Sequence, residues 1–236
     1  MSEQRHSQWR GIRAKSAAWW FNTRARTRVE HGVLETIRST VRKDDVVLDL
    51  GAGTGFFALA VAPMLDGGRV VALDLSPDML SGLVRHATRS RLTSRIEPVV
   101  AEATKTGLPD ASVNLVISGN LLHELPDPAA ALNEMARVLK PGGHVVIQDF
   151  HDGIVGRLMK ALHHHQARGA LGTDEIGRQL RAAGFSDVRV TASGVRYLAT
   201  GRKNSICEAQ ERPEAPSGHE KETERGVIPS PHATGV

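Results

Sequence analysis

The chain has 236 residues, 40% of them hydrophobic and 24% charged, with a formal net charge of +4. These values describe one sizeable globular domain, and they exclude a largely disordered chain or two large domains. The single cysteine, Cys207, excludes an intramolecular disulfide, and no apolar stretch approaches the ~20 residues of a membrane-spanning helix. Because the start of the chain also lacks the apolar segment of a secretory signal, we expect a cytoplasmic protein.

Residues 1–42 are predicted to form an N-terminal helical lid region. A helix is expected from Ala17 to Thr40, with Trp19, Trp20 and Phe21 near its start. These aromatic side chains either anchor the helix to the core or cover a bound ligand. The basic residues of this region are read as a solvated helix face.

From residue 43 onward, apolar runs predict strands and helices in alternation. Strands are expected at 46–50, 69–74, 96–100, 113–118 and 144–150, and helices at 54–65, 77–89 and 128–139. Ser76 and Asp127 each precede a proline and are expected to cap the helices that follow. This pattern predicts an α/β fold, a doubly wound and mainly parallel sheet with helices on both faces.

The alternation stops after Phe150. Residues 151–172 are expected to be an insertion near the substrate pocket, and they contain His163, His164 and His165. Successive helical side chains diverge by about 100°, so we do not expect these three to bind a metal ion. Thr173 is expected to cap a helix that ends at Gly184, followed by strands at 187–192 and 195–202. Residues 204–236 are poor in apolar side chains and are predicted to be a disordered tail.

The first strand is followed by the glycine turn, Gly51-Ala52-Gly53-Thr54-Gly55. Small residues allow a sharp turn from strand into helix and a close approach of a ligand to the main chain. A helix beginning at Thr54 would direct its N–H groups at that ligand. The turn therefore predicts a binding site for a carboxylate or a phosphate.

Charge and spacing separate the possible nucleoside ligands. A dinucleotide fingerprint is G-x-G-x-x-G, and Phe56 stands where its third glycine would be. Asp49 would repel a pyrophosphate but attract an amine, and Asp74 at the end of the second strand suits ribose hydroxyls. An amine, a carboxylate and a ribose together predict S-adenosylmethionine (SAM) rather than NAD.

The stretch VVLDLGAGTGFFALAVA (46–62) resembles the nucleoside-binding motif of class I SAM-dependent methyltransferases. GNLLHEL (119–125) and LKPGGHVVIQDF (139–150) are similar to that family's motifs after the fourth strand and at the fifth strand. The similarity is greatest to the small-molecule, ubiquinone/menaquinone-biosynthesis-like branch (methyltransferase type 11). It implies a Rossmann-like SAM-binding domain over 43–203, with seven strands of which the last is antiparallel. It also implies methyl transfer from SAM to a small-molecule acceptor by in-line displacement.

The resemblance assigns cofactor contacts to residues at the carboxyl ends of the first four strands. These are Asp49, Gly51, Ala52, Gly53, Gly55, Asp74, Leu75, Met79, Glu102, Ala103 and Asn120. Glu102 stands where the family usually has aspartate. Asn114, where the family commonly has aspartate, is read as structural.

Four residues are candidate general bases because they follow the fourth and fifth strands, where ligands bind in such sheets. They are His123, Glu124, Asp149 and His151. Each of them could instead pack, cap or fix a loop locally.

Two alternatives remain open from the sequence. The chain could be a SAM-binding partner subunit without catalysis, because intact binding motifs do not require chemistry. A nucleic-acid methyltransferase is disfavoured, because Ser118-Gly119-Asn120-Leu121 lacks the Asn/Asp-Pro-Pro-aromatic segment of base-amine methylators. Neither the acceptor atom nor the oligomeric state is indicated.

Overall fold

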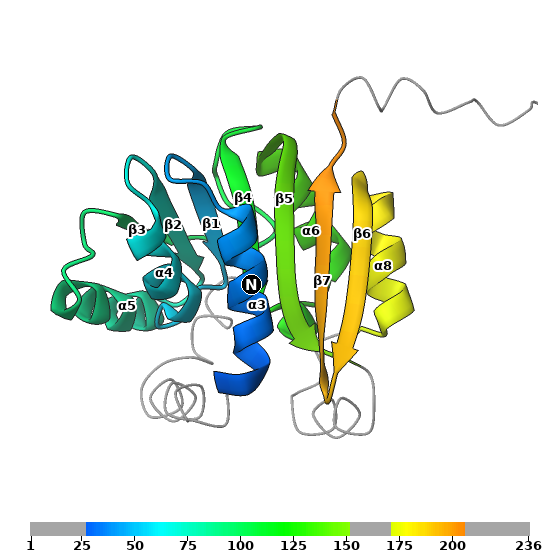
Figure 1. The fold of residues 1–236 in the computed structure, drawn as a ribbon, viewed down its shortest axis with the longest axis horizontal. Helices are drawn as coiled ribbons and strands as arrows, with labels where there is room; N and C mark the ends of the chain where they lie inside the picture. Colours follow the sequence, from blue (N-terminus) through cyan, green and yellow to red (C-terminus); the bar gives the residue numbers. More distant parts are fainter. Residues whose placement is uncertain (1–26, 152–170, 206–236) are drawn as a thin grey trace, which may run out of the picture.

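The structure is a computed structural model that describes residues 27–151 and 171–205 (Figure 1). The predictions for Trp19, Trp20 and Phe21, for His163 to His165 and for the tail after residue 205 lie outside the described residues. None of the helices in the described ranges is long and apolar enough to cross a bilayer.

The elements alternate along the chain. The strands are β1 (Val46–Leu50), β2 (Arg69–Asp74), β3 (Ile96–Val100), β4 (Val113–Gly119), β5 (Leu139–Phe150), β6 (Phe185–Ser193) and β7 (Arg196–Lys203). The α-helices are α3 (Thr27–Thr40), α4 (Phe56–Val61), α5 (Pro77–Arg89), α6 (Pro128–Val138) and α8 (Thr173–Ala182), and two 3-10 turns are η2 (Ala62–Met64) and η3 (Leu122–Glu124).

The strands form one sheet in the order β3-β2-β1-β4-β5-β7-β6 (Figure 1). Neighbours from β3 to β5 are parallel, and β7 is antiparallel to both β5 and β6. The predicted fold, a mainly parallel seven-stranded sheet with an antiparallel last strand, is confirmed. The chain order reverses between β1 and β4, and ligands of open α/β sheets bind at such a switch point.

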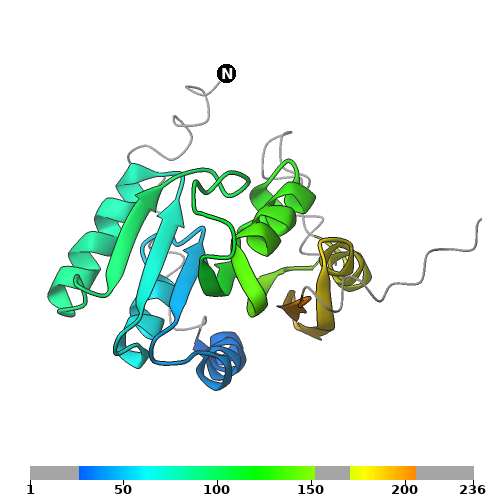
Figure 2. The ribbon, with the colours of Figure 1, turned by 90° about the horizontal axis from the view of Figure 1, so that it is seen from above.

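Two apolar layers cover the two faces of the sheet. One layer packs α6 and α8 against alternate strand residues such as Leu48 and Val116. The other packs α3, α4 and α5 against the intervening residues, such as Val47 and Leu115. Helices therefore lie on both faces, as Figure 2 shows for α3 and α6. Within α3, Val33 and Ile37 are buried in the second layer.

Four predicted boundaries are wrong. The helix expected at 54–65 begins at Phe56, because Gly55 is its N-cap in a left-handed conformation (φ 93°), and it ends in the 3-10 turn η2. The cap of α8 is Gly172 rather than Thr173, and no side chain caps that helix. The helix expected at 128–139 ends at Val138, and β5 begins at Leu139 because that residue already pairs with Val113. The strand expected at 187–192 begins at Phe185.

Two of the three predicted helix caps are confirmed. The Ser76 hydroxyl accepts a hydrogen bond from Met79 N at 3.3 Å, and Asp127 accepts one from Ala130 N at 3.1 Å. Each cap is followed by the proline that begins the helix, so these boundaries were set locally.

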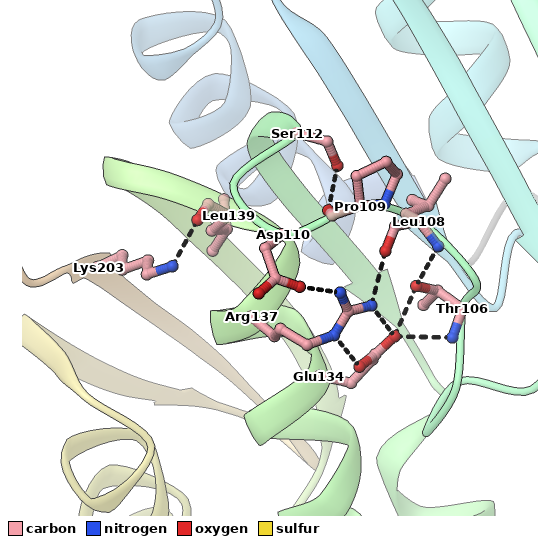
Figure 3. Close-up of polar contacts among 9 residues, drawn as sticks. All are labelled: Thr106, Leu108, Pro109, Asp110, Ser112, Glu134, Arg137, Leu139 and Lys203. Atoms are coloured by element: carbon pink, nitrogen blue, oxygen red, sulfur yellow. Dashed lines mark hydrogen bonds and ion pairs between the residues drawn. The ribbon is translucent and has the colours of Figure 1, made fainter.

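A partly buried ionic network, shown in Figure 3, joins the β3–β4 loop to α6. Glu134 accepts from Arg137 Nε and Nη2 at 2.8 and 2.7 Å, and from Thr106 N and Oγ1 at 2.8 and 2.6 Å. Arg137 also donates to Leu108 O at 2.8 Å and pairs with Asp110. The network holds the loop that begins with the cofactor candidates Glu102 and Ala103.

Candidate functional site

The glycine turn at the end of β1 uses its three glycines for different purposes. All three have positive φ, 77° at Gly51, 53° at Gly53 and 93° at Gly55. A Cβ on Gly51 would lie 3.1 Å from Leu121, and one on Gly55 would lie 2.8 Å from Leu83, so these two serve close packing. A Cβ on Gly53 would meet no atom within 4 Å. Gly53 is therefore the glycine beside which a ligand has room.

Asp74 fastens this turn to the end of β2. Its Oδ2 accepts from Gly53 N and its Oδ1 from Ser76 N, both at 2.8 Å. Burial raises the pKa of Asp74, although the backbone N–H groups of Ser76, Gly53 and Leu75 oppose that shift. A carboxylate has about four acceptor positions, so acceptor capacity remains for a ribose hydroxyl.

Asp49 lies one layer deeper, at 1% exposure. Its Oδ2 accepts from Ala58 N at 2.9 Å, in the first turn of α4. The side chain therefore holds the short helix in place behind the glycine turn and contributes a negative charge there.

The remaining cofactor candidates lie along the same edge of the sheet. Leu75 and Met79 follow β2, Glu102 and Ala103 follow β3, and Asn120 follows β4. Glu102 is exposed, and Ala103 packs against the α6 side of the core.

Asn120 has an unusual setting for an asparagine. It is 8% exposed, its φ is 56°, and its N–H donates to Gln148 O at 2.8 Å. Its carboxamide atoms have no hydrogen-bond partner among the described residues. A buried unpartnered amide is costly, so a polar partner from outside the described part of the chain is expected here.

Three of the four candidate general bases converge at the carboxyl ends of β4 and β5. His123 Nδ1 lies 2.6 Å from Asp149 Oδ1, and the backbone N–H of His123 donates to Asp149 Oδ2 at 3.2 Å. His123 Nε2 lies 3.8 Å from Glu124 Oε1. Asp149 is 1% exposed, whereas the Glu124 side chain is 28% exposed. The three form a chain of acid–base groups that leads from the sheet outward.

Burial and neighbouring charges shift the pKa values of His123 and Glu124. Burial by itself lowers the pKa of His123, but the hydrogen bond and charge of Asp149, with the charge of Glu124, raise it overall. Burial, together with the charges of Asp149 and Asp74, raises the pKa of Glu124 to about 7 despite the opposing charge of His123. Glu124 can therefore exchange a proton near neutral pH.

His151 lies apart from this group. Its Nε2 donates to Gly194 O at 2.7 Å, and its backbone N–H donates to Val195 O at 3.1 Å, so it lies at the β6–β7 turn. Asn114, read as structural, accepts from Val46 N and from Lys140 Nζ and joins three strands.

The sequence reasoning missed two features near the end of β5. The Phe150 ring meets the His123 imidazole edge-on at 5.2 Å between centroids, and the Arg196 guanidinium lies 4.9 Å from the centre of the Phe150 ring. Gln148 is 1% exposed, and its amide has no partner among the described residues. A glutamine inside the apolar run VVIQDF was the available signal.

The residues present fit SAM. The space beside Gly53 admits a ligand, and Asp49, Asp74, Asp149 and Glu124 make this edge acidic, which suits a cation better than a pyrophosphate. Within the described ranges, no group of three or more His, Cys, Asp or Glu residues is arranged to hold a metal ion.

Comparisons with known proteins agree with the fold and the motifs. Residues 48–147 match the family described as "Methyltransferase domain". The ubiquinone/menaquinone biosynthesis C-methyltransferase UbiE of Francisella philomiragia is 38% identical over 128 residues, which cover 53% of this chain and 51% of that protein. The chain thus matches about half the length of this curated relative.

Solved structures show the same fold. A putative methyltransferase from Bacillus halodurans aligns with a TM-score of 0.65 and 20% identity, covering 75% of this chain and 100% of that one. A SAM-dependent methyltransferase from Aquifex aeolicus aligns with a TM-score of 0.58 and 24% identity, covering 72% and 88%. Residues 48–147 therefore resemble a methyltransferase domain, and the predicted resemblance of the chain to the SAM-dependent methyltransferases is confirmed.

Proposed function

We propose that this chain transfers a methyl group from SAM to a small-molecule acceptor. The observation that carries the proposal is the open space beside Gly53 together with the Asp74 carboxylate that its N–H binds. This arrangement leaves space beside the main chain of Gly53 and offers carboxylate oxygens that could accept from ribose hydroxyls.

The cofactor would be held by the residues of this edge. Asp74 would accept from the ribose, the main chain at Gly53 would lie against the ligand, and Asp49 and Glu124 would contribute negative charge. When bound, SAM supplies a methyl group on an activated sulfonium. The residues of the chain then mainly align the acceptor, and good alignment can lower a barrier by roughly 7–11 kcal/mol.

His123 and Glu124 would accept the proton of an acceptor that must lose one. The Asp149 carboxylate accepts from His123 Nδ1–H, which leaves Nε2 as the basic nitrogen. Nε2 and the Glu124 carboxylate face one another, so one proton can be shared between them. Such a base typically contributes about 10²–10⁴-fold to a rate.

The curated relative is named for quinone biosynthesis, and we propose ring precursors of quinones as the first acceptors to assay. Transfer of a labelled methyl group from SAM to the acceptor is the measurement. With an acceptor that must be deprotonated, His123→Asn is expected to lower kcat by about 10²–10⁴-fold. A protein that binds SAM but methylates no acceptor would instead act as a non-catalytic SAM-binding subunit.

The binding step is tested by calorimetry with SAM, S-adenosylhomocysteine and NADH. We expect micromolar affinity for SAM and no binding of NADH. Asp74→Ala should weaken SAM binding by about 1–3 kcal/mol, because charge-assisted hydrogen bonds are lost. Asp66→Ala, an exposed carboxylate before β2, is the matched control and should bind normally. Preference for NADH over SAM would refute the proposal.

A further inference from the structure

The segment after β4 lies directly against the glycine turn. The Leu121 side chain occupies the space above Gly51, 3.1 Å from where a Cβ would be. Glu124 N donates to Leu121 O at 2.9 Å, so Glu124 follows one 3-10 turn later. Glu124 is therefore held near the turn at which the cofactor would bind.

The charged groups around Glu124 come from three elements. His123 lies beside it in η3, with Nε2 at 3.8 Å from Oε1. Asp149 acts on it from β5 and Asp74 from the end of β2. Arg196, at the start of β7, acts on His123. Glu124 and Asp74 thus interact electrostatically at the same edge of the sheet, where Asp74 also binds Gly53 of the glycine turn.

A second observation indicates a polar ligand near the segment that carries Glu124. Asn120 lies between the end of β4 and η3, is more than nine-tenths buried, and has a carboxamide without a partner among the described residues. Its position places an unsatisfied polar group next to the segment that carries Glu124.

We propose that the Glu124 carboxylate makes this site select SAM over its demethylated product, S-adenosylhomocysteine. This inference rests on the proposed function. The two ligands share the adenosine, the amine and the carboxylate, and they differ in one methyl group and in the positive charge on sulfur. A carboxylate near the sulfur attracts the sulfonium and gains little from the neutral thioether. Loss of that charge during the reaction then weakens binding of the product.

The selection has to depend on pH, because only the ionised Glu124 attracts a cation. Glu124 titrates near neutral pH in this setting. SAM affinity should therefore rise with pH across that range, while the affinity for S-adenosylhomocysteine changes less. Each unit by which bound SAM lowers the pKa of Glu124 makes SAM bind about tenfold more tightly above that range than below it.

The test is calorimetry of both ligands at pH 6 and pH 8 with the full chain. The measured quantity is the Kd of S-adenosylhomocysteine divided by the Kd of SAM. For the unmodified protein we expect this ratio to rise about tenfold between the two pH values. Glu124→Gln should lose most of this rise, Glu124→Asp should retain it, and Glu97→Gln, an exposed carboxylate in β3 paired with Arg69, should leave it unchanged.

The outcomes separate this inference from the proposed function. If both ligands bind with a ratio that does not change with pH, the selection by Glu124 is refuted while SAM binding stands. If the pH-dependent ratio persists in Glu124→Gln, a group other than Glu124 causes it, and the inference is wrong. If neither ligand binds at either pH, both the inference and the proposed function fail. Urea unfolding of each variant establishes that it is folded before binding is measured.

Discussion

At the scale of single residues, Asp74 and Glu124 show how differently two carboxylates of the same edge are held. Asp74 accepts from the backbone N–H groups of Gly53, Leu75 and Ser76, which stabilise its charge and oppose the effect of burial. Glu124 faces His123 at 3.8 Å and lies in the field of two other carboxylates. The first arrangement suits a fixed anchor for a ligand, and the second suits a group that changes its protonation state.

The setting of Glu124 predicts a stability cost. Because its pKa is raised to about 7 in the folded protein, its ionisation opposes folding, and the free energy of unfolding should fall as pH rises from about 4.5 to about 7. Glu124→Gln is therefore expected to be more stable than the unmodified protein at pH 8, and the difference should shrink toward pH 4.5. Urea unfolding at several pH values measures this. A variant that is less stable at pH 8 would show that Glu124 contributes a structural contact.

At the scale of elements, the glycine turn combines a left-handed backbone conformation with space for a ligand beside the main chain. Gly53 and Gly107 form a matched pair, since both have positive φ, 53° and 76°, and a Cβ on either would meet no atom within 4 Å. They differ in place, because Gly53 lies in the turn after β1 and Gly107 in the loop between β3 and β4.

Alanine substitutions at these two glycines should distinguish the effect of backbone strain on stability from the effect of a lost ligand contact on SAM binding. Both Gly53→Ala and Gly107→Ala place an L-residue in a left-handed conformation, which costs about 1–2 kcal/mol of unfolding free energy. Only Gly53→Ala should also weaken SAM binding, because its methyl group enters the space beside the turn. Chemical denaturation and calorimetry of both variants give the two quantities. Equal SAM affinity in the two variants would mean that the ligand does not approach Gly53.

The Glu134–Arg137 network is a second feature that joins elements of the structure. Its hydrogen bonds from Arg137 hold the pKa of Glu134 down, at about 2. The stabilisation is therefore present above the unfolded pKa near 4.5 and is lost as pH falls toward 2. Glu134→Gln should lower the unfolding free energy at pH 7 by about 1.5–3 kcal/mol, the usual value for hydrogen bonds to charged groups.

The pH dependence of this decrease in unfolding free energy tests whether the charge of Glu134 causes it. The difference in unfolding free energy between Glu134→Gln and the unmodified protein should narrow as pH falls below 4.5, because the unmodified protein then loses the charged contact that the variant already lacks. Glu97→Gln removes a carboxylate from an exposed ion pair and serves as the control, with an expected change under about 1 kcal/mol. A difference that stays constant down to pH 3 would contradict the charge-based account.

At the scale of the whole molecule, the site is built from the ends of strands that belong to a single sheet. β1, β2, β4 and β5 all contribute, and their neighbours pair over four or more residues. A ligand bound across these ends should therefore stabilise the folded domain as a unit.

That coupling predicts a measurable shift in global stability. SAM at 100 times its Kd should raise the unfolding free energy by about 2.7 kcal/mol, whereas NADH at the same concentration should not change it. Urea unfolding followed by circular dichroism measures both. The same stabilisation by NADH would indicate a dinucleotide site instead.

By itself, the sequence determined the features that depend on neighbouring residues. Apolar runs, the prolines after Ser76 and Asp127, and the glycine turn are local signals, and the succession of strands and helices and two helix caps agree with them. Local signals predicted an element boundary less well where pairing with another strand decides it. Leu139, for example, belongs to β5 because it lies opposite Val113.

The tertiary structure alone decided which candidates meet. In the pairing of β4 with β5, Gly119 lies opposite Gln148. The next residue of β5, Asp149, therefore lies beside the turn that follows β4 and contacts His123. His151, two residues beyond Asp149, instead donates a hydrogen bond to Gly194 O at the β6–β7 turn. Contacts between residues far apart in the chain depend on strand order and register, and no local pattern in the sequence encodes those distances.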